Sequence, residues 1–251
     1  MTREVQKLNN EGDEAGKAEL PETFGTTYRP DLIERAFLAT QSSEKQPYGT
    51  DEHAGLRTSA ESRGSGQGLA HVPRVKGTSR AARVPHTKGG RRAHPPKAEK
   101  KIGEEFNDKE RALAFESAVA ATADEVRVRD RGHDFGEDVS LPVVLDAEFE
   151  ELVKTQEVVE VLESLDLHAD VERADEGRGV RSGRGKTRGR KYRTPKSILF
   201  VTADEFRAAR NLPGADVVRA EELGVPDLAP GGDAGRLTVW TEPALEVLDE
   251  R

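Results

Sequence analysis

The sequence contains no cysteine, and only one methionine and one tryptophan among its 251 residues. Without cysteine the chain can form no disulfide, no thiolate metal site and no thiol nucleophile, which is typical of a cytoplasmic protein. No apolar run approaches the ~18 residues of a membrane span, and the start Met1-Thr-Arg-Glu-Val lacks the apolar core of a signal peptide. We therefore expect a cytoplasmic protein with no membrane partner, of a length that suits one large domain or two small ones.

Two stretches of the chain also have few large apolar residues. Of the 53 Leu, Ile, Val and Phe residues, five lie in residues 53–98 and one, Val180, lies in residues 177–196. Both fractions fall below the roughly 20% at which chains stop folding alone. Half of the 24 glycines lie in the same stretches, which raises the entropy cost of ordering them. We expect these stretches to become ordered only against a partner, while the remaining 185 residues bury a core.

Acidic residues are nearly absent from the same two stretches. The formal net charge is −8, but residues 53–98 carry +9 with one acid, residues 177–196 carry +9 with none, and the rest of the chain carries −26. Arginine supplies 13 of the 19 basic groups in these stretches. The basic residues are, in the first stretch, Arg57, Arg63, Arg74, Lys76, Arg80, Arg83, Lys88, Arg91, Arg92 and Lys97 and, in the second, Arg178, Arg181, Arg184, Lys186, Arg188, Arg190, Lys191, Arg193 and Lys196.

Helix and strand signals alternate outside the basic stretches. Val5 to Leu8 and Ala18 to Leu20 flank a turn sequence and predict a hairpin, and Asp31 opens a helix that continues to about Ala39. Asn107 with Glu110 predicts a capping box for an alanine-rich helix to about Ala123. The second half predicts strands at 141–145, 198–201, 216–218 and 236–240, and helices at 155–165, from Asp204 to about Arg210, and from Thr241 with Pro243 onward.

This alternation predicts an α/β fold: a mostly parallel sheet flanked by helices, in a Rossmann-like three-layer arrangement with a long extended internal loop. We expect residues 1–52 and 99–251 to form the globular α/β domain. Residues 53–98 are then an extended basic loop, and residues 177–196 a second basic loop within the domain. Each arm of the longer loop has about 23 residues and can span on the order of 75 Å. A structureless loop of this length is reasonable if it threads into something much larger.

Two glycine motifs suggest nucleotide binding, but their context is wrong. Gly185-Lys186-Thr187 resembles the end of a phosphate-binding loop, yet the position five residues before Gly185 is Val180, and no strand or helix pattern flanks the motif. Gly64-Ser-Gly-Gln-Gly lacks the GxGxxG spacing, and no strand leads into it. A flexible loop whose backbone closely approaches another surface is the better interpretation of both.

Histidines and carboxylates give no catalytic or metal pattern. His71, His86 and His94 lie in a Gly/Pro-rich segment without i,i+4 spacing or paired carboxylates, so polar contacts to phosphate or base suit them better than metal ligation. We expect His133 to be a turn residue between a helix and a strand. No nucleophile elbow supports a Ser/His/Asp triad. We therefore predict no enzyme activity, no catalytic residue, no metal and no cofactor.

The basic stretches favour binding to RNA. A charge run is usually a solvated face, but here the positive charge is segregated, and the planar fork of arginine binds phosphate bidentately. Glycine and serine between the arginines let the backbone follow an irregular polyanion. Aromatic residues such as Tyr192 are too sparse for a stacking platform, so recognition of the shape and phosphates of folded RNA is the expected mode.

Nine blocks of sequence, several of them long, together closely resemble the archaeal and eukaryotic branch of large-subunit ribosomal protein four, and the resemblance covers nearly the whole chain. The blocks are Gly55-Leu-Arg-Thr-Ser-Ala-Glu-Ser, Gly64-Ser-Gly, Ala70-His-Val-Pro-Arg, His94-Pro-Pro-Lys, Arg131-Gly-His, Leu152-Val-Lys-Thr-Gln-Glu-Val-Val, Gly183-Arg-Gly-Lys-Thr-Arg-Gly-Arg-Lys-Tyr-Arg, Ala209-Arg-Asn-Leu-Pro-Gly-Ala and Leu228-Ala-Pro-Gly-Gly-Asp-Ala-Gly-Arg-Leu-Thr-Val-Trp-Thr-Glu.

The resemblance implies a structural constituent of the large ribosomal subunit. It implies a primary rRNA binder that acts early in subunit assembly and contacts several rRNA domains. The family's internal loop lines the polypeptide exit tunnel beside large-subunit protein twenty-two, so the nascent polypeptide is a further implied partner. Carried onto this sequence, the loop tip is expected around Thr58 to Gly68, centred on Ser62, Arg63, Gly64, Ser65, Gly66, Gln67 and Gly68. The implied rRNA-binding residues are Arg57, Arg74, Lys76, Arg80, Arg83, Lys88, Arg91, Arg92, Lys97, Arg178, Arg181, Arg184, Lys186, Arg188, Arg190, Lys191 and Arg193.

Two tip positions depart from the family pattern. Arg63 stands where relatives usually have an aromatic residue, and Gln67 where they usually have arginine, which predicts a more hydrophilic tunnel wall. The acidic remainder, with 13 lysines to 26 arginines, suggests a halophilic archaeon. Two other functions stay open from the residues alone: a small α/β enzyme acting on nucleic acid or nucleotide, which would need a complete phosphate loop or clustered catalytic residues, and a free RNA-binding regulator.

Overall fold

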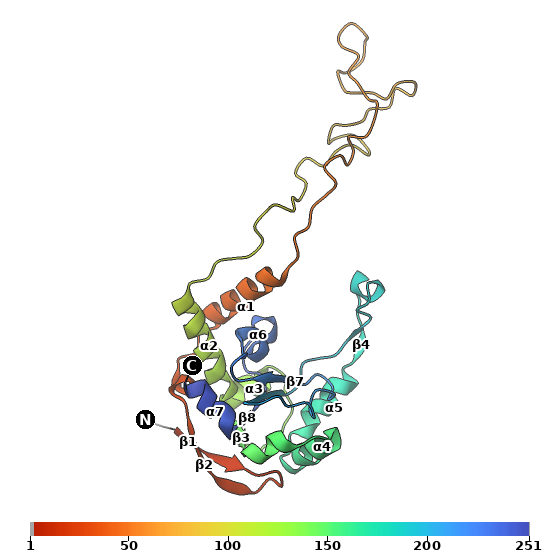
Figure 1. Cartoon of the computed structure of the whole chain (residues 1–251). Helices are drawn as coiled ribbons and strands as arrows, with labels where there is room; N and C mark the ends of the chain where they lie inside the picture. The colour runs from red at the N-terminus through yellow and green to blue at the C-terminus, as the bar shows by residue number, and fades with distance from the viewer. Residues whose placement is uncertain (1–2, 251) are drawn as a thin grey trace. The chain divides into compact units, whose positions relative to one another are not determined.

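The computed structural model describes residues 3–250 and divides the chain into two units. The first unit comprises Met1–Gln41 with Glu104–Arg251, and the second unit is Ser42–Gly103 (Figure 1). The first unit contains the central sheet.

A six-stranded sheet organises the first unit. Its strand order is β2-β1-β3-β8-β6-β7, and only the β1/β2 pair at one end is antiparallel, whereas the other four pairs are parallel. This confirms the predicted α/β fold with a mostly parallel sheet. The strands are β1 (Arg3–Leu8), β2 (Glu14–Leu20), β3 (Val143–Leu145), β6 (Leu199–Thr202), β7 (Asp216–Arg219) and β8 (Thr238–Thr241).

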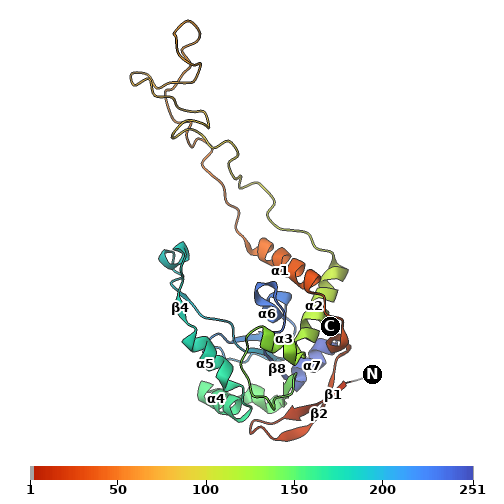
Figure 2. The same cartoon turned by 180° about the vertical axis from the view of Figure 1, so that it is seen from behind.

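Helices cover both faces of this sheet (Figures 1 and 2). Neighbouring residues of a strand point to opposite faces, so Val144 and Trp240 enter one apolar cluster while Val143 and Val239 enter the other. The first cluster includes side chains of α1 (Pro30–Glu44), α2 (Asp108–Thr122), α6 (Val225–Leu228) and α7 (Glu242–Asp249). The second includes side chains of α3 (Glu125–Asp130), α4 (Thr155–Ser164) and α5 (His168–Glu176).

Short elements complete the first unit. The described residues of this unit also form four 3-10 helices: η1 (Glu22–Gly25), η2 (Ala147–Glu151), η3 (Arg184–Thr187) and η4 (Pro230–Gly232). A separate two-stranded ribbon pairs β4 (Gly179–Val180) with β5 (Tyr192–Arg193). The predicted hairpin, the strands around residues 143, 199, 216 and 238, and the helices beginning near residues 31, 108, 155 and 242 are confirmed.

The helix predicted from Asp204 to about Arg210 is wrong. The chain forms turns there, because distant side chains hold the backbone in another path. The Glu150 carboxylate accepts the backbone N–H groups of Ala203 and Asp204 at 2.9 and 3.0 Å. The ring of Phe206 packs against that of Phe149, with centroids 4.9 Å apart. These tertiary contacts override a weak local helix signal.

The capping box predicted at the start of α2 is also wrong in part. Asn107 is the N-cap residue, as expected, but its side chain makes no capping hydrogen bond. The Glu110 carboxylate instead lies 3.5 Å from the Arg35 guanidinium. The helix therefore begins where the sequence indicates without the reciprocal side-chain bonds.

The second unit has little regular structure. Beyond the end of α1, its described residues form no helix and no strand, apart from two isolated bridges, Glu61 to Arg74 and Arg74 to Ala81. Backbone hydrogen bonds join residues far apart in this segment, such as Thr50 N–H to the Pro96 carbonyl at 3.1 Å and Arg91 N–H to the Arg83 carbonyl at 3.2 Å.

Candidate nucleic-acid interface

The second basic loop is a short ribbon with an irregular end. Gly179 pairs with Arg193 and Val180 pairs with Tyr192, and the Arg181 N–H donates to the Lys191 carbonyl at 3.0 Å. The end is formed by η3 and by the N–H groups of Arg188 and Arg190, which both donate to the Gly185 carbonyl, at 3.0 and 3.2 Å. The backbone is thus bonded to itself, and the cationic side chains of the loop are exposed, although the Arg181 side chain also donates to the Tyr192 carbonyl at 3.2 Å.

The cations of this loop are available to an anion. All eight predicted RNA-binding residues from Arg178 to Arg193 are exposed. In the part of the chain that the structure describes, no carboxylate lies within ion-pair distance of any of them. Their positive charge is therefore not neutralised inside the protein, and phosphate oxygens are the acceptors that suit closely spaced guanidinium groups.

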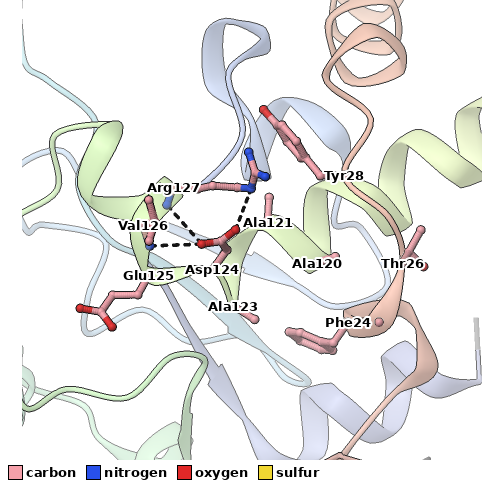
Figure 3. Close-up of a pocket in the computed structure, with 11 residues that line it drawn as sticks. Phe24, Thr26, Tyr28, Ala120, Ala121, Ala123, Asp124, Glu125, Val126 and Arg127 are labelled. Carbon is pink, nitrogen blue, oxygen red and sulfur yellow. Dashed lines mark hydrogen bonds and ion pairs between the residues drawn. The ribbon is translucent and has the colours of Figure 1, made fainter.

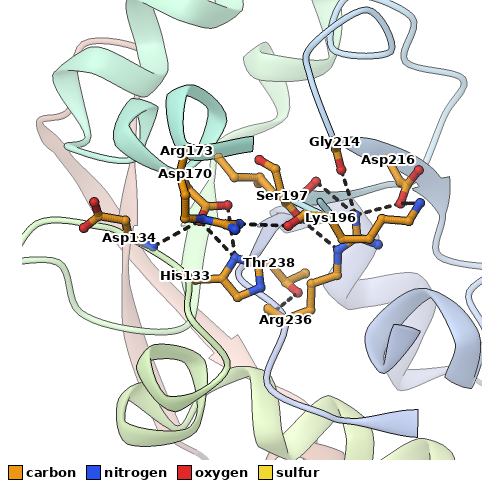
Figure 4. Close-up of polar contacts among 11 residues, drawn as sticks. His133, Asp134, Asp170, Arg173, Lys196, Ser197, Gly214, Asp216, Arg236 and Thr238 are labelled. Atoms are coloured by element: carbon orange, nitrogen blue, oxygen red, sulfur yellow. Dashed lines mark hydrogen bonds and ion pairs between the residues drawn. The ribbon is translucent and has the colours of Figure 1, made fainter. Parts of the chain in front are cut away.

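Buried charges fix the base of this loop in the first unit (Figure 4). The Arg173 guanidinium donates to the Lys196 carbonyl at 2.8 Å and to the Asp170 carboxylate at 2.9 Å. Asp170 is fully buried and lies 3.0 Å from Nδ1 of His133, which is 7% exposed. Burial raises the pKa of Asp170, but the hydrogen bonds from His133 and Arg173 outweigh burial, so its pKa lies below the ordinary value.

Arg236, a buried cation, holds the same stretch of backbone from the other side. Its guanidinium donates to the carbonyls of Ser197 and Asp227 at 2.9 and 3.0 Å and to the Asp216 carboxylate at 2.7 Å. Lys196 donates to the same Asp216 oxygen at 2.7 Å. Burial lowers the pKa of Arg236, and burial of Asp216 is outweighed by its two cations, so the pKa of Asp216 is lowered.

Close backbone packing completes the base of the loop. A Cβ added to Gly177 would lie 2.7 Å from the Pro195 ring, so the two ends of the loop are in contact. A Cβ on Gly214 would lie 2.3 Å from the Pro195 carbonyl oxygen, and Gly214 has a φ of +72°. Only glycine meets both conditions at residue 214. The loop therefore rises from a rigid root.

In the second unit, the predicted cations fall into two groups. Arg57 is paired in a bidentate arrangement with Asp51, and Arg74 and Arg80 donate to the carbonyls of Ser79 and Lys88 at 3.0 and 3.1 Å. These three side chains are partly used in holding the segment together. The others are exposed and have no ion pair among the described residues: Lys76, Arg83, Lys88, Arg91, Arg92 and Lys97.

The predicted tip, Ser62 to Gly68, is exposed throughout. Gly64, Gly66 and Gly68 all have φ between +63° and +80°, and a Cβ added to any of them would meet nothing within 4 Å. These glycines supply left-handed turns and not close packing. The Arg63 guanidinium donates to the Ser79 hydroxyl at 3.0 Å, while Gln67 is exposed.

The motifs that suggested nucleotide or metal chemistry lie in unsuitable places. Gly185-Lys186-Thr187 occupies the single 3-10 turn η3 beyond a two-residue strand, and not a loop between a buried strand and a helix. His71, His86 and His94 are exposed. Residues 3–250 contain no group of three or more His, Cys, Asp or Glu side chains arranged to hold a metal ion. Over the same residues, no helix combines the length and apolar character needed to span a membrane.

One pocket of about 500 Å³ lies between η1 and the junction of α2 with α3 (Figure 3). Two of its charged side chains pair with each other: the Asp124 carboxylate accepts the N–H groups of Val126 and Arg127 at 3.1 and 3.4 Å and forms an ion pair with the Arg127 side chain at 2.8 Å. The Arg127 guanidinium also lies 3.6 Å from the centre of the Tyr28 ring. These contacts cap α3 and pack one wall of the pocket.

Sequence reasoning placed His133 correctly between a helix and a strand but missed its role. The His133–Asp170 contact joins residues 37 positions apart, and Arg236 lies 39 positions from the carbonyl that it binds. A buried polar residue in an apolar context is the only signal that could have indicated either contact, and spacing alone does not show its partner.

Known proteins resemble this chain over all or nearly all of its length. A sequence model described as the ribosomal protein L4/L1 family matches residues 18–251. Large ribosomal subunit protein uL4 of Haloquadratum walsbyi is 61% identical over 252 residues, covering 100% of both chains. The protein of the same name from Halobacterium salinarum is 58% identical over 96% of this chain and 97% of its own length. That of Methanocaldococcus jannaschii is 53% identical over 100% of this chain and 99% of its own.

Proposed function

Because the chain belongs to the ribosomal protein L4/L1 family, we propose that it is a structural protein of the large ribosomal subunit, located in the cytoplasm, that binds rRNA through its two basic segments. The observation that carries this proposal is the second basic loop, whose eight cations are exposed and without carboxylate partners while its root is fixed by buried charges. A fixed root that carries exposed cations without carboxylate partners among the described residues suits a surface that must meet phosphates at defined places. We propose no catalytic role.

The two basic segments have different roles in this proposal. The globular α/β domain, residues 1–52 and 99–251, anchors the loop at 177–196, and residues 53–98 form an extended arm that orders along rRNA. In this proposal the arm reaches the polypeptide exit tunnel and its tip forms part of the wall, beside protein twenty-two and in contact with the nascent polypeptide. The Rossmann-like description of the domain stays a prediction.

The tip glycines support this assignment of the arm. No protein atom lies within 4 Å of a Cβ placed on any of them, so these left-handed turns leave room for another molecule to approach the backbone closely. With Arg63 and Gln67 at the tip, the wall contributed by this chain is hydrophilic. Contacts of both segments with several rRNA domains, made early in assembly, would give the protein its architectural role.

Sedimentation tests the proposal. The full-length chain, tagged and expressed in a haloarchaeal host depleted of its own copy, is expected to co-sediment stoichiometrically with large subunits in a high-salt sucrose gradient. A wholly free pool would refute the ribosomal function and favour an RNA-binding regulator or an enzyme.

Two deletions test the division of work. Removal of residues 178–193 is expected to weaken incorporation strongly, whereas removal of residues 62–68 leaves incorporation largely intact and abolishes crosslinks from the arm to the nascent chain. Equal loss of incorporation from both deletions would contradict the separate roles.

A further inference from the structure

The basic ribbon contains one exposed apolar pair. Val180 and Tyr192 are register partners in the antiparallel β4/β5 pair, so their side chains lie on the same face. Val180 is 55% exposed and Tyr192 is 50% exposed. A two-residue ribbon gains little from an aliphatic–aromatic pair that stays half in water. The pair is therefore unexplained by the folding of the loop.

Cations surround the tyrosine ring. The Arg178 guanidinium lies 5.1 Å from the ring centre and the Lys191 ammonium lies 5.2 Å from it. Arg181 donates from Nε to the Tyr192 carbonyl at 3.2 Å and so fixes the backbone that bears the ring. An aromatic ring on a fixed backbone, with exposed cations stacked over it, has the composition of a site for one nucleotide.

We propose that Tyr192 stacks on an unpaired base of the bound RNA, with Val180 beside it and with Arg178 and Lys191 moving from the ring to the flanking phosphates. This deepens the proposed function by naming the ligand of this part of the loop. Stacking on an aromatic side chain is worth more than a water-exposed cation–π contact, and each displaced cation gains a phosphate partner. The exchange is favourable for both groups. It also adds a contact with a base to a loop whose other contacts are with phosphate.

Salt dependence separates stacking from phosphate binding. Affinity of the full-length chain for deproteinised haloarchaeal large-subunit rRNA is measured by filter binding across a KCl series. Tyr192→Leu is expected to weaken binding by about 5-fold to 150-fold at every salt concentration, the equivalent of about 1–3 kcal/mol, with an unchanged slope of log affinity against log salt. Arg188→Gln, which removes a cation with no partner among the described side chains, is expected to reduce that slope by about 1.

Matched variants keep the test specific. Tyr192→Phe and Tyr192→Trp retain a ring and are expected to bind within about 2-fold of the wild type, since stacking tolerates any aromatic face. Tyr48→Leu removes another exposed tyrosine, 66% exposed and outside both predicted sets of site residues, and should leave affinity unchanged. Ultraviolet crosslinking followed by mass spectrometry is expected to find a nucleotide on Tyr192.

Different results would overturn the stacking of Tyr192 on a base and the binding of rRNA. Wild-type affinity for Tyr192→Leu, or a loss that disappears at high salt, overturns stacking while rRNA binding stands. No binding of the wild-type chain at any salt concentration overturns the proposed function itself, and stacking with it.

Discussion

Replacing Arg236 by methionine is expected to destabilise the domain by removing the buried cation beneath the second basic loop. Methionine keeps most of the side-chain volume, so the change isolates the guanidinium group. Arg236 donates to the carbonyls of Ser197 and Asp227 and to the Asp216 carboxylate. It also donates to the carbonyls of Ile198 and Gly214. Each of these carbonyls accepts a backbone N–H as well, so each keeps one hydrogen bond in the variant.

The magnitude follows from the groups left without a donor. A buried polar group that loses its partner costs about 1–3 kcal/mol, so the Ser197 and Asp227 carbonyls together give about 2–6 kcal/mol. This range agrees with the roughly 3–5 kcal/mol typical of breaking a buried charge pair. Asp216 adds little, because it is partly exposed and keeps Lys196. We therefore expect a loss of about 3–5 kcal/mol.

Urea unfolding of the full-length protein in molar KCl, followed by circular dichroism, measures this loss. With a slope of ~2 kcal/mol per molar urea, the midpoint should fall by ~1.5–2.5 M. Lys196→Met is the matched control, since it removes the exposed partner of the same carboxylate and should cost no more than about 1 kcal/mol. Equal midpoints for Arg236→Met and Lys196→Met would refute the assignment of Arg236 as the main support of the loop root.

Two further changes test the same region. Gly214→Ala is expected to lower the free energy of unfolding by more than about 2 kcal/mol, because the added Cβ would lie 2.3 Å from the Pro195 carbonyl oxygen. The control Gly132→Ala has a φ of +91° but nothing within 4 Å of its Cβ, so it should cost only about 1 kcal/mol. Equal urea midpoints for the two variants would contradict the packing argument. The pKa of Asp170 is lowered in the folded state, so the stabilisation that its carboxylate gives is present above the unfolded pKa of ~3.9 and is lost as the pH falls through the lower folded pKa. Asp170→Asn should therefore be less stable than the wild type at neutral pH and should lose less stability than the wild type between ~pH 4 and ~pH 2. Parallel curves of stability against pH for the two proteins would contradict this.

Local signals predicted much of the fold because many of its elements are specified by their own residues. The Ile198 to Val201 run is buried on both faces of the sheet, and the apolar spacing of Val158, Val161 and Leu162 places the buried face of α4. Pro243 lies in the first turn of α7, where it needs no N–H partner. Each of these signals depends on neighbours within one element, which is why the sequence shows it.

The sequence-based predictions fail where residues far apart in the sequence determine the local structure. The turns after Asp204 depend on Glu150, more than fifty positions away, and a helix signal of one capping residue cannot compete with it. The β4/β5 ribbon has two residues in each strand, too few for an alternating pattern. Charge counting located both basic segments, but it could not separate Arg57, which is paired with Asp51, from Arg188, which has no side-chain partner among the described residues.

Local pairing, and not net charge, should rank the cations for RNA binding. In salt of ~1 M the Debye length is only ~3 Å, so the −26 carried outside the two basic segments neither repels RNA nor competes for the loop arginines across a distance. A carboxylate competes only in direct contact, as Asp51 does for Arg57. Binding of phosphate by Arg57 must first break that pair, whereas Arg188 has no carboxylate partner among residues 3–250 to lose. We therefore expect Arg188→Gln to weaken rRNA binding more than Arg57→Gln, although both remove one positive charge, and equal losses in the filter-binding series would show that long-range charge governs binding instead.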